Sequence, residues 1–174
     1  MKSIVTDNFF AEPYKMIEFA KSQTYYPRNS EQNYEGIRTP NLREIDEQFY
    51  SEVTTELVYN YYDKRKTYKI EGNLNFHKLS TKDLQDEKWI HDKVHKDNCV
   101  LSSILYLTPD APMTSGTQLY RDIDNTYVPD VIYHNKFNRL IQFPGPIPHS
   151  AMDFDGGDEE RLTMLFFLEK IDEI

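Results

Sequence analysis

Two histidines and one aspartate are the side chains of this sequence best placed to hold a metal ion. His95 and Asp97 are separated by one residue, so in an extended backbone both side chains point to the same side. His149 lies farther along the chain, in a segment stiffened by alternating prolines. Two imidazoles and one carboxylate on one face of an octahedral metal leave three adjacent positions open, enough for a chelating ligand and oxygen together. These three residues therefore predict an iron(II) site.

An arginine near the end of the sequence could bind the anion that such a site needs. Arg161 and Thr163 share one face of a predicted strand, and a guanidinium beside a hydroxyl is a good receptor for a carboxylate. Between His149 and Arg161 there is room for one strand end, one turn and a return strand, so we expect both residues in the same sheet. The carboxylate receptor would then lie beside the metal.

Taken in order, these features resemble the Fe(II)- and 2-oxoglutarate-dependent dioxygenases, in particular their prolyl-4-hydroxylase-like branch. Members of that superfamily carry an H-x-D pair, a distal histidine, and an arginine followed two residues later by serine or threonine. This chain has H-K-D at 95–97, then His149, then R-L-T at 161–163. The segment LSSILYLT is similar to the strand that follows the H-x-D pair, and it places Tyr106 where a tyrosine often contacts the co-substrate. The later segment SGTQLYR has one glycine, Gly116, where the superfamily has two.

The resemblance implies both the cofactors and the reaction. Fe(II) would be bound by His95, Asp97 and His149, with 2-oxoglutarate and O2 as co-substrates. The residues that the resemblance assigns to the far carboxylate of 2-oxoglutarate are Arg161, Thr163 and Tyr106. The expected activity is hydroxylation of an unactivated C–H bond, with succinate and CO2 as co-products. The substrate would be a peptide side chain such as proline, or a small metabolite.

Other interpretations of the same residues stay open. His91 precedes His95 by four residues, which on a helix would form a two-histidine zinc face, although Asp92 stands where a glutamate is usual. Cupin-type metal proteins, isomerases among them, would use the metal ligands without the Arg161 receptor. A catalytically silent jelly-roll module, with a metal-binding or structural role, is the alternative from outside the enzymes. Arg161 could instead form a surface ion pair with acidic residues 158–160.

Several polar residues have weaker indications. His77 and His134 are expected to make ordinary hydrogen bonds, because isolated histidines are more often structural than functional. Arg38, Arg121 and the tyrosines of segment 25–34 are candidates to line the mouth of the substrate site, since loops commonly supply such residues. Tyr106 could equally be a buried core tyrosine.

The elements that must position these residues change in type along the chain. Apolar residues recur at helical spacing over 13–22 and again over 42–61, where they predict an amphipathic helix of about five turns. Segment 25–40 between them indicates an irregular loop. From residue 67 onward the pattern favours strands. The expected strands fall at 68–70, 74–76, 99–107, 131–133, 138–143 and 161–168.

The expected fold is α+β and mainly β. A helical first third followed by short strands suggests helices that brace a sandwich or jelly roll, and the resemblance makes this a double-stranded β-helix, a cupin-like barrel. We expect one domain over 1–174, with helical support and loop in 1–66 and the jelly-roll oxygenase core in 67–174.

Composition narrows the partners and the compartment. A net charge of −9 and a pI near 5.0 disfavour nucleic acid and anionic membranes as partners. The single cysteine, Cys99, allows no internal disulfide, and no apolar run is long enough to span a bilayer. We therefore expect a soluble, cytoplasmic protein without export signals.

Overall fold

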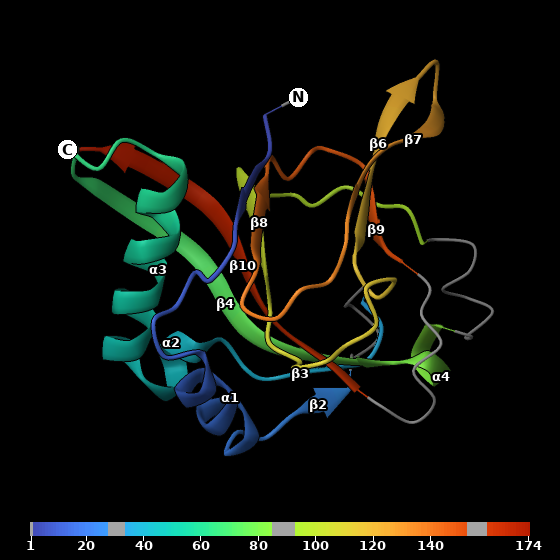
Figure 1. The fold of residues 1–174 in the computed structure, drawn as a ribbon. Helices are drawn as coiled ribbons and strands as arrows, with labels where there is room; N and C mark the ends of the chain where they lie inside the picture. Colours follow the sequence, from blue (N-terminus) through green and yellow to red (C-terminus); the bar gives the residue numbers. More distant parts are fainter. Residues whose placement is uncertain (1, 28–33, 85–92, 153–159) are drawn as a thin grey trace.

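A seven-stranded antiparallel sheet forms the centre of the molecule (Figure 1). The computed structural model describes residues 2–27, 34–84, 93–152 and 160–174, and all structural statements refer to these. The strands of this large sheet, in spatial order, are β1 (Ile4–Thr6), β8 (Leu140–Phe143), β5 (Leu101–Tyr106), β10 (Glu160–Glu173), β4 (Tyr68–Ser80), β3 (Ile37–Arg38) and β2 (Tyr26–Pro27).

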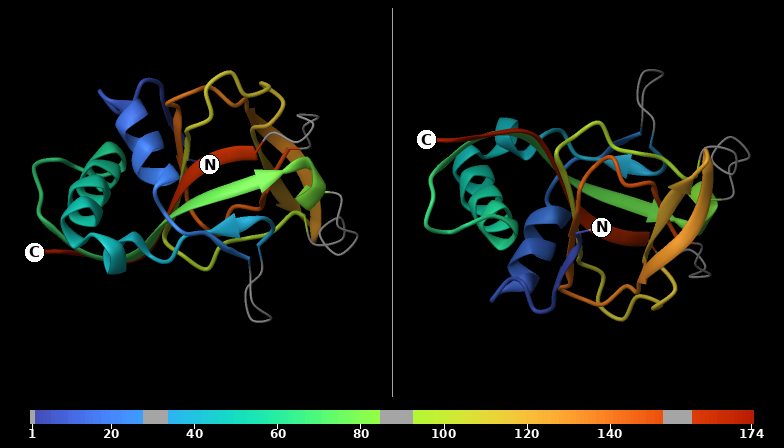
Figure 2. Two further views of the ribbon diagram at one scale, coloured as in Figure 1. Left: turned by 90° about the horizontal axis from the view of Figure 1, so that it is seen from below. Right: turned by 90° about the horizontal axis from the view of Figure 1, so that it is seen from above.

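A second, smaller sheet covers one face of the large sheet. Its strands, in spatial order, are β7 (Thr126–Tyr133), β6 (Thr117–Ile123) and β9 (His149–Ala151). The helices lie on the opposite face of β4 and β10, as both views in Figure 2 show. These are α1 (Pro13–Lys21), α2 (Leu42–Ile45) and α3 (Glu47–Tyr61), while α4 (Thr81–Leu84) follows the end of β4.

Strand β10 shows how the sequence separates the two faces of the large sheet. Met164 and Phe166 pack into a hydrophobic cluster with residues of α1 and α3. The alternate residues Arg161 and Leu165 instead line a pocket shared with residues of the small sheet. A second apolar cluster, centred on Tyr106, fills part of the space between the sheets. The core therefore lies mainly under the helices, and the polar pocket lies between the sheets.

The predicted helix over 42–61 is interrupted, and this part of the prediction is wrong. Asp46 has an extended backbone, with φ −151° and ψ 97°, and separates α2 from α3. Its side chain accepts a hydrogen bond from the backbone N–H of Phe49 at 2.9 Å. Aspartate at this position caps the first turn of a helix, so the local capping preference overrides the apolar periodicity that continues across it.

Segment 25–40 is more regular than predicted. It contains β2 and β3, which extend the edge of the large sheet, and Arg38 of β3 lies in register with His77 of β4. The two strands expected at 68–70 and 74–76 are parts of the single strand β4. The prediction of a mainly β chain is confirmed, and the described strands of both sheets pair antiparallel.

The prediction that His149 and Arg161 lie in the same sheet is wrong. His149 is in β9 of the small sheet, and Arg161 is in β10 of the large sheet. The strands β8, β9 and β10 alternate between the two sheets, as consecutive strands do in jelly-roll folds, instead of forming a hairpin. The two side chains consequently face the space between the sheets from opposite sides.

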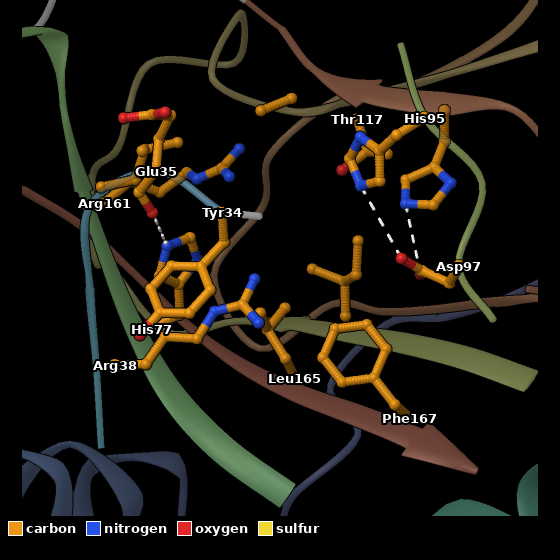
Figure 3. Close-up of a pocket in the computed structure, with 14 residues that line it drawn as sticks. Tyr34, Glu35, Arg38, His77, His95, Asp97, Thr117, Arg161, Leu165 and Phe167 are labelled. Atoms are coloured by element: carbon orange, nitrogen blue, oxygen red, sulfur yellow. Dashed lines mark hydrogen bonds and ion pairs between the residues drawn. The ribbon is translucent and has the colours of Figure 1, made fainter. Parts of the chain in front are cut away.

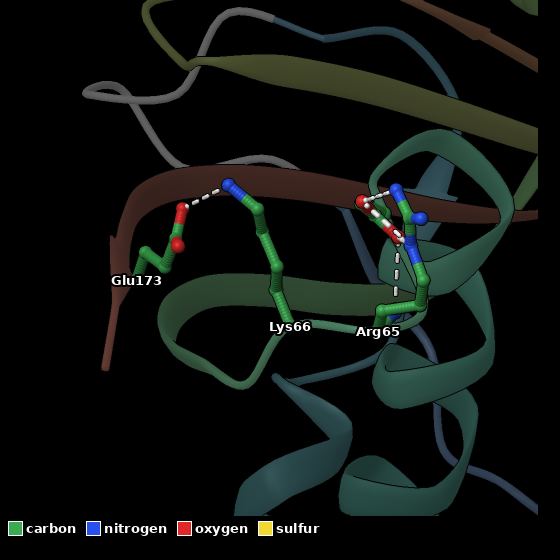
Figure 4. A network of polar contacts seen from close by, with 4 residues as sticks. Arg65, Lys66 and Glu173 are labelled. Atoms are coloured by element: carbon green, nitrogen blue, oxygen red, sulfur yellow. Dashed lines mark hydrogen bonds and ion pairs between the residues drawn. The ribbon is translucent and has the colours of Figure 1, made fainter.

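The C-terminal end of β10 is tied to the loop that follows α3 by surface charges (Figure 4). Lys66 Nζ lies 2.7 Å from Glu173 Oε2, and the neighbouring Arg65 binds Asp63. Exposed pairs of this kind contribute about 1 kcal/mol or less. In the described part of the chain, no helix is long and apolar enough to cross a membrane.

Candidate functional site

The structure brings His95, Asp97 and His149 together. One ligand atom from each lies within 4.8 Å of the others. His95 Nε2 is 3.7 Å from one carboxylate oxygen of Asp97, and His149 Nε2 is 3.4 Å from the other. Figure 3 marks both contacts with dashed lines that meet at Asp97. The convergence expected from the sequence is present, whereas the role of these residues as iron ligands stays a prediction.

Backbone pairing holds the two histidines side by side. His95 lies in the segment before β5 and forms an isolated antiparallel bridge with His149 of β9. The N–H of His95 donates to the carbonyl of His149 at 3.0 Å, and the N–H of His149 donates back at 2.9 Å. The rings lie with centroids 4.4 Å apart. The main chain therefore sets the position of both imidazoles.

The other nitrogen of each ring fixes its tautomer. His95 Nδ1 lies 3.1 Å from the carbonyl of Lys93, and His149 Nδ1 lies 2.9 Å from the carbonyl of Ile147. A carbonyl oxygen can only accept, so in the neutral rings Nδ1 carries the hydrogen and Nε2 keeps its lone pair. Both lone pairs then face the Asp97 carboxylate, which also only accepts. Such a set of converging acceptors is suited to a cation.

Asp97 is itself held from two sides. The hydroxyl of Ser102 donates to Asp97 Oδ2 at 2.6 Å. The N–H of Asp97 donates to the carbonyl of Gly145 at 2.9 Å. A side chain at Gly145 would collide with the backbone carbonyl of Cys99, so glycine is needed for this close approach. Local packing thus orients the carboxylate toward the histidines.

Burial keeps His149 neutral. Its side chain is almost fully buried in β9, and desolvation lowers the pKa of His149 to about 4, against the opposing effect of the Asp97 charge. A neutral imidazole is the form that binds a metal. At neutral pH this ring therefore needs no deprotonation before binding.

Arg161 faces the same pocket and does not reach the surface. It is 6% exposed, and Nη1 donates to the carbonyls of Ser115 and Gly116 at 2.8 and 3.0 Å. Its Nε is buried and has no acceptor among the described residues. Glu160, which could have formed a surface pair with it, binds Lys78 instead. A buried guanidinium with donors to spare can receive a carboxylate.

The other two residues assigned to the co-substrate lie behind the pocket wall. Thr163 and Tyr106 are in register on β10 and β5, and both are fully buried. The Tyr106 hydroxyl donates to Thr117 at 2.7 Å, and Thr117 lines the pocket whereas Tyr106 and Thr163 do not. Burial raises the pKa of Tyr106, so it stays a neutral donor. Their contact with the co-substrate stays a prediction.

The pocket has a cavity volume of about 120 Å³ and two chemically different ends. Figure 3 shows His95 and Asp97 on one side, and Arg161, Arg38 and His77 on the other. The middle is apolar. The apolar side chains that line the pocket are Leu79, Ile104, Ala151, Leu165 and Phe167.

Sequence reasoning assigned the pocket residue His77 only a structural role. Its Nε2 donates to the carbonyl of Glu35 at 2.6 Å, as an ordinary hydrogen-bonding histidine would, yet His77 and Glu35 both line the pocket. Burial, and then the positive charge of Arg38, hold the pKa of His77 well below its usual value. The sequence contained a signal for this position of His77. Leu74 and Phe76 face the core, so the alternating odd-numbered residues of β4, His77 among them, face the other side of the sheet.

The remaining candidates fall into two groups. Arg38 and Tyr34 line the pocket, whereas Arg121 does not and instead binds Asp130. The place of Arg38 and Tyr34 at the mouth of a substrate site stays a prediction. His134 is exposed and bonds to a backbone carbonyl. His91, on which the zinc interpretation depends, lies outside the described residues, as do Asp158 and Glu159.

Sequence comparison identifies a family but no activity. The model of a family described as "Family of unknown function (DUF6445)" matches residues 2–129, a range that contains His95 and Asp97. No curated protein matches the chain in sequence.

Several solved structures share the fold of this chain. A prolyl hydroxylase from Trichoplax adhaerens, in complex with a hypoxia inducible factor peptide, is 11% identical, with a TM-score of 0.61 over 96% of this chain and 83% of that chain. HygX from Streptomyces hygroscopicus, with nickel and 2-oxoglutarate bound, is 9% identical, with a TM-score of 0.63 over 96% and 82% of the two chains. The alpha ketoglutarate dependent epimerase SnoN, from nogalamycin biosynthesis, is 11% identical, with a TM-score of 0.62 over 96% and 78%. The fold is thus that of 2-oxoglutarate/Fe(II) oxygenases, prolyl hydroxylases among them, which confirms the resemblance at the level of the fold.

Proposed function

The chain belongs to the DUF6445 family, whose function is unknown, and we propose that it is an Fe(II)- and 2-oxoglutarate-dependent oxygenase that hydroxylates a C–H bond. The observation that carries this proposal is the pair of Nε2 lone pairs of His95 and His149 directed at the Asp97 carboxylate, in one pocket with the buried Arg161. The fold alone would not support an activity, because one fold hosts many functions.

The residues present fit an iron(II) ion. Two imidazole nitrogens and one carboxylate oxygen on one face are a donor set that Fe(II) accepts with positions left open. Iron bound there would activate O2 and couple the oxidation of 2-oxoglutarate, to succinate and CO2, to hydroxylation of the substrate. HygX, which shares the fold, binds nickel and 2-oxoglutarate, and this supports a divalent metal and 2-oxoglutarate as ligands of this chain.

The remaining pocket residues would position and shield the reactants. Ser102 holds the Asp97 carboxylate, and Arg161 receives the far carboxylate of 2-oxoglutarate, with Thr163 and Tyr106 behind it. The apolar middle of the pocket excludes water from the reacting atoms. In this proposal the two sheets are a double-stranded β-helix. Residues 67–174 form most of its oxygenase core, and residues 1–66 add the supporting helices and the strands β1, β2 and β3, within one domain.

Anaerobic addition of Fe(II) and 2-oxoglutarate tests the proposal. The chelate should give a weak visible metal-to-ligand absorption band, and His149→Ala should abolish it. His134→Ala is the matched control, since His134 is exposed and outside the pocket, and it should keep the band. A protein that binds iron at the site but shows no band with 2-oxoglutarate would be the silent metal-binding module instead.

A further inference from the structure

A second arginine, Arg38, lines the same pocket as Arg161. Arg38 of β3 lies in register with His77 of β4, and His77 lies in register with Thr163 of β10. Side chains in register across an antiparallel sheet point to the same face. Arg38 therefore points to the face that carries Arg161, and β4 lies between the two strands, a separation of about 10 Å across two strand spacings. The pocket has two separate guanidinium groups.

Two aromatic rings lie beside the Arg38 guanidinium. Its Cζ lies 4.0 Å from the centroid of the Tyr34 ring and 5.5 Å from that of the Phe167 ring. The N–H donors of a guanidinium lie in its plane, so stacking on the rings uses none of them. The contact with the two rings restrains the Arg38 guanidinium and leaves its N–H groups available for hydrogen bonds.

The edge of Arg38 has donors to spare. Its Nε is buried and has no acceptor among the described residues, and within that part of the chain no carboxylate forms an ion pair with it. Burial lowers the pKa of Arg38 to about 10, so it stays charged at neutral pH. A buried charge whose donors lack acceptors raises the free energy of the folded protein, unless an anion binds to it.

We propose that Arg38 binds a carboxylate of the primary substrate, which is a small carboxylic acid whose aliphatic part crosses the apolar middle of the pocket toward the metal. This inference rests on the proposed oxygenase function. Arg161, fixed by two backbone carbonyls, then serves 2-oxoglutarate, and Arg38 serves the molecule to be oxidised.

The geometry favours a carboxylate over a phosphate. A carboxylate is planar and can lie in the plane of the guanidinium, where it accepts two parallel hydrogen bonds. A tetrahedral phosphate cannot place all its oxygens in the guanidinium plane, and it would bring up to two negative charges beside the Glu35 carboxylate, which lines the same pocket. Because the carboxylate of Glu35 also lines the pocket, recognition would depend on the directed donors of Arg38 rather than on net positive charge.

Calorimetric titration of the full-length protein tests the inference. The protein is first saturated with Zn(II), as a redox-inert metal, and with 2-oxoglutarate. The probes are straight-chain monocarboxylates from acetate to octanoate, each compared with its primary amide. We expect one chain length to bind best, with the acid favoured over the amide by about tenfold or more, as charge-assisted hydrogen bonds predict.

Three variants identify the residue responsible. Arg38→Gln should remove the preference for the acid while 2-oxoglutarate affinity stays unchanged. Arg38→Lys keeps the positive charge and serves if Arg38→Gln folds poorly. It should retain part of the preference for the acid. Arg121→Gln, an exposed arginine outside the pocket, should behave as wild type.

Three results would overturn the inference: acids that bind no better than amides, an acid preference that survives in Arg38→Gln, or an Arg38→Gln protein that loses 2-oxoglutarate. The last would make Arg38 part of the co-substrate site. If wild type failed to bind Zn(II) or 2-oxoglutarate at all, the proposed function itself would fail, and this result is seen before any acid is added.

Discussion

His95 and His149 exchange two backbone hydrogen bonds, which place two imidazoles from distant parts of the chain side by side. The pairing joins the segment before β5 to β9 of the small sheet. Because this pairing uses backbone groups alone, it does not depend on a metal. The imidazole side chains stay available to bind a cation.

Metal should therefore stabilise a protein that is already folded. At Fe(II) or Zn(II) a hundredfold above the dissociation constant, the free energy of unfolding should rise by about 2.7 kcal/mol. His149→Asn keeps the backbone pairing but removes the imidazole, so its metal-free form should unfold cooperatively and gain nothing from metal. Urea titrations with and without metal measure both effects. An unfolded metal-free wild type would contradict this prediction.

Ser102→Ala should weaken the metal site without removing a ligand. The variant loses the hydrogen bond that orients Asp97, and losses of such supporting contacts typically cost about 10- to 100-fold in metal affinity. Competition with a chromogenic chelator measures the change. Ser51→Ala, an exposed serine of α3, is the control. Wild-type affinity in Ser102→Ala would show that the carboxylate is held by other contacts.

Arg161→Gln should separate metal binding from co-substrate binding. It removes the charge assigned to the far carboxylate of 2-oxoglutarate, worth about 1.5–3 kcal/mol, while His95, Asp97 and His149 stay in place. We expect 2-oxoglutarate affinity to fall by about one to two orders of magnitude and metal affinity to stay within twofold. Arg161→Lys should not restore it fully, because an ammonium lacks the planar fork. A parallel loss of metal affinity would indicate a structural role for Arg161.

His77 gives stability a defined dependence on pH. Its pKa is lowered by burial in the folded protein, so the unfolded chain binds a proton near pH 6.5 that the folded protein does not. Stability is then full above that pH and falls as the pH is lowered through about 6.5, because only the unfolded chain takes up the proton. His77→Gln should reduce that loss in the metal-free protein. An unchanged pH dependence of the urea midpoint would mean that His77 is protonated in the fold.

The sequence predicted the convergence of the three candidate metal ligands better than it predicted the framework that holds them. The H-x-D spacing and the proline-rich segment before His149 are local features, and helix 13–21 and strand β5 follow from local periodicity. The break at Asp46 was missed because apolar spacing continues through it, although the capping residue is visible in the sequence.

Local sequence patterns could not predict which distant segments of the chain pair with each other. The register of Arg38 with His77 depends on which short strands meet at the edge of the sheet, and the placement of His149 and Arg161 in different sheets depends on the path between β9 and β10. Neither leaves a periodic trace in the sequence. The position of Arg38 beside Arg161 in the pocket could therefore be found only in three dimensions.

A crystal structure of the anaerobic Fe(II) and 2-oxoglutarate complex, with anomalous scattering measured at the iron edge, tests the central claim most directly. We predict one iron peak within bonding distance of His95 Nε2, an Asp97 carboxylate oxygen and His149 Nε2, with the far carboxylate of 2-oxoglutarate on Arg161. An iron that binds elsewhere, or that leaves His149 uncoordinated, would contradict it.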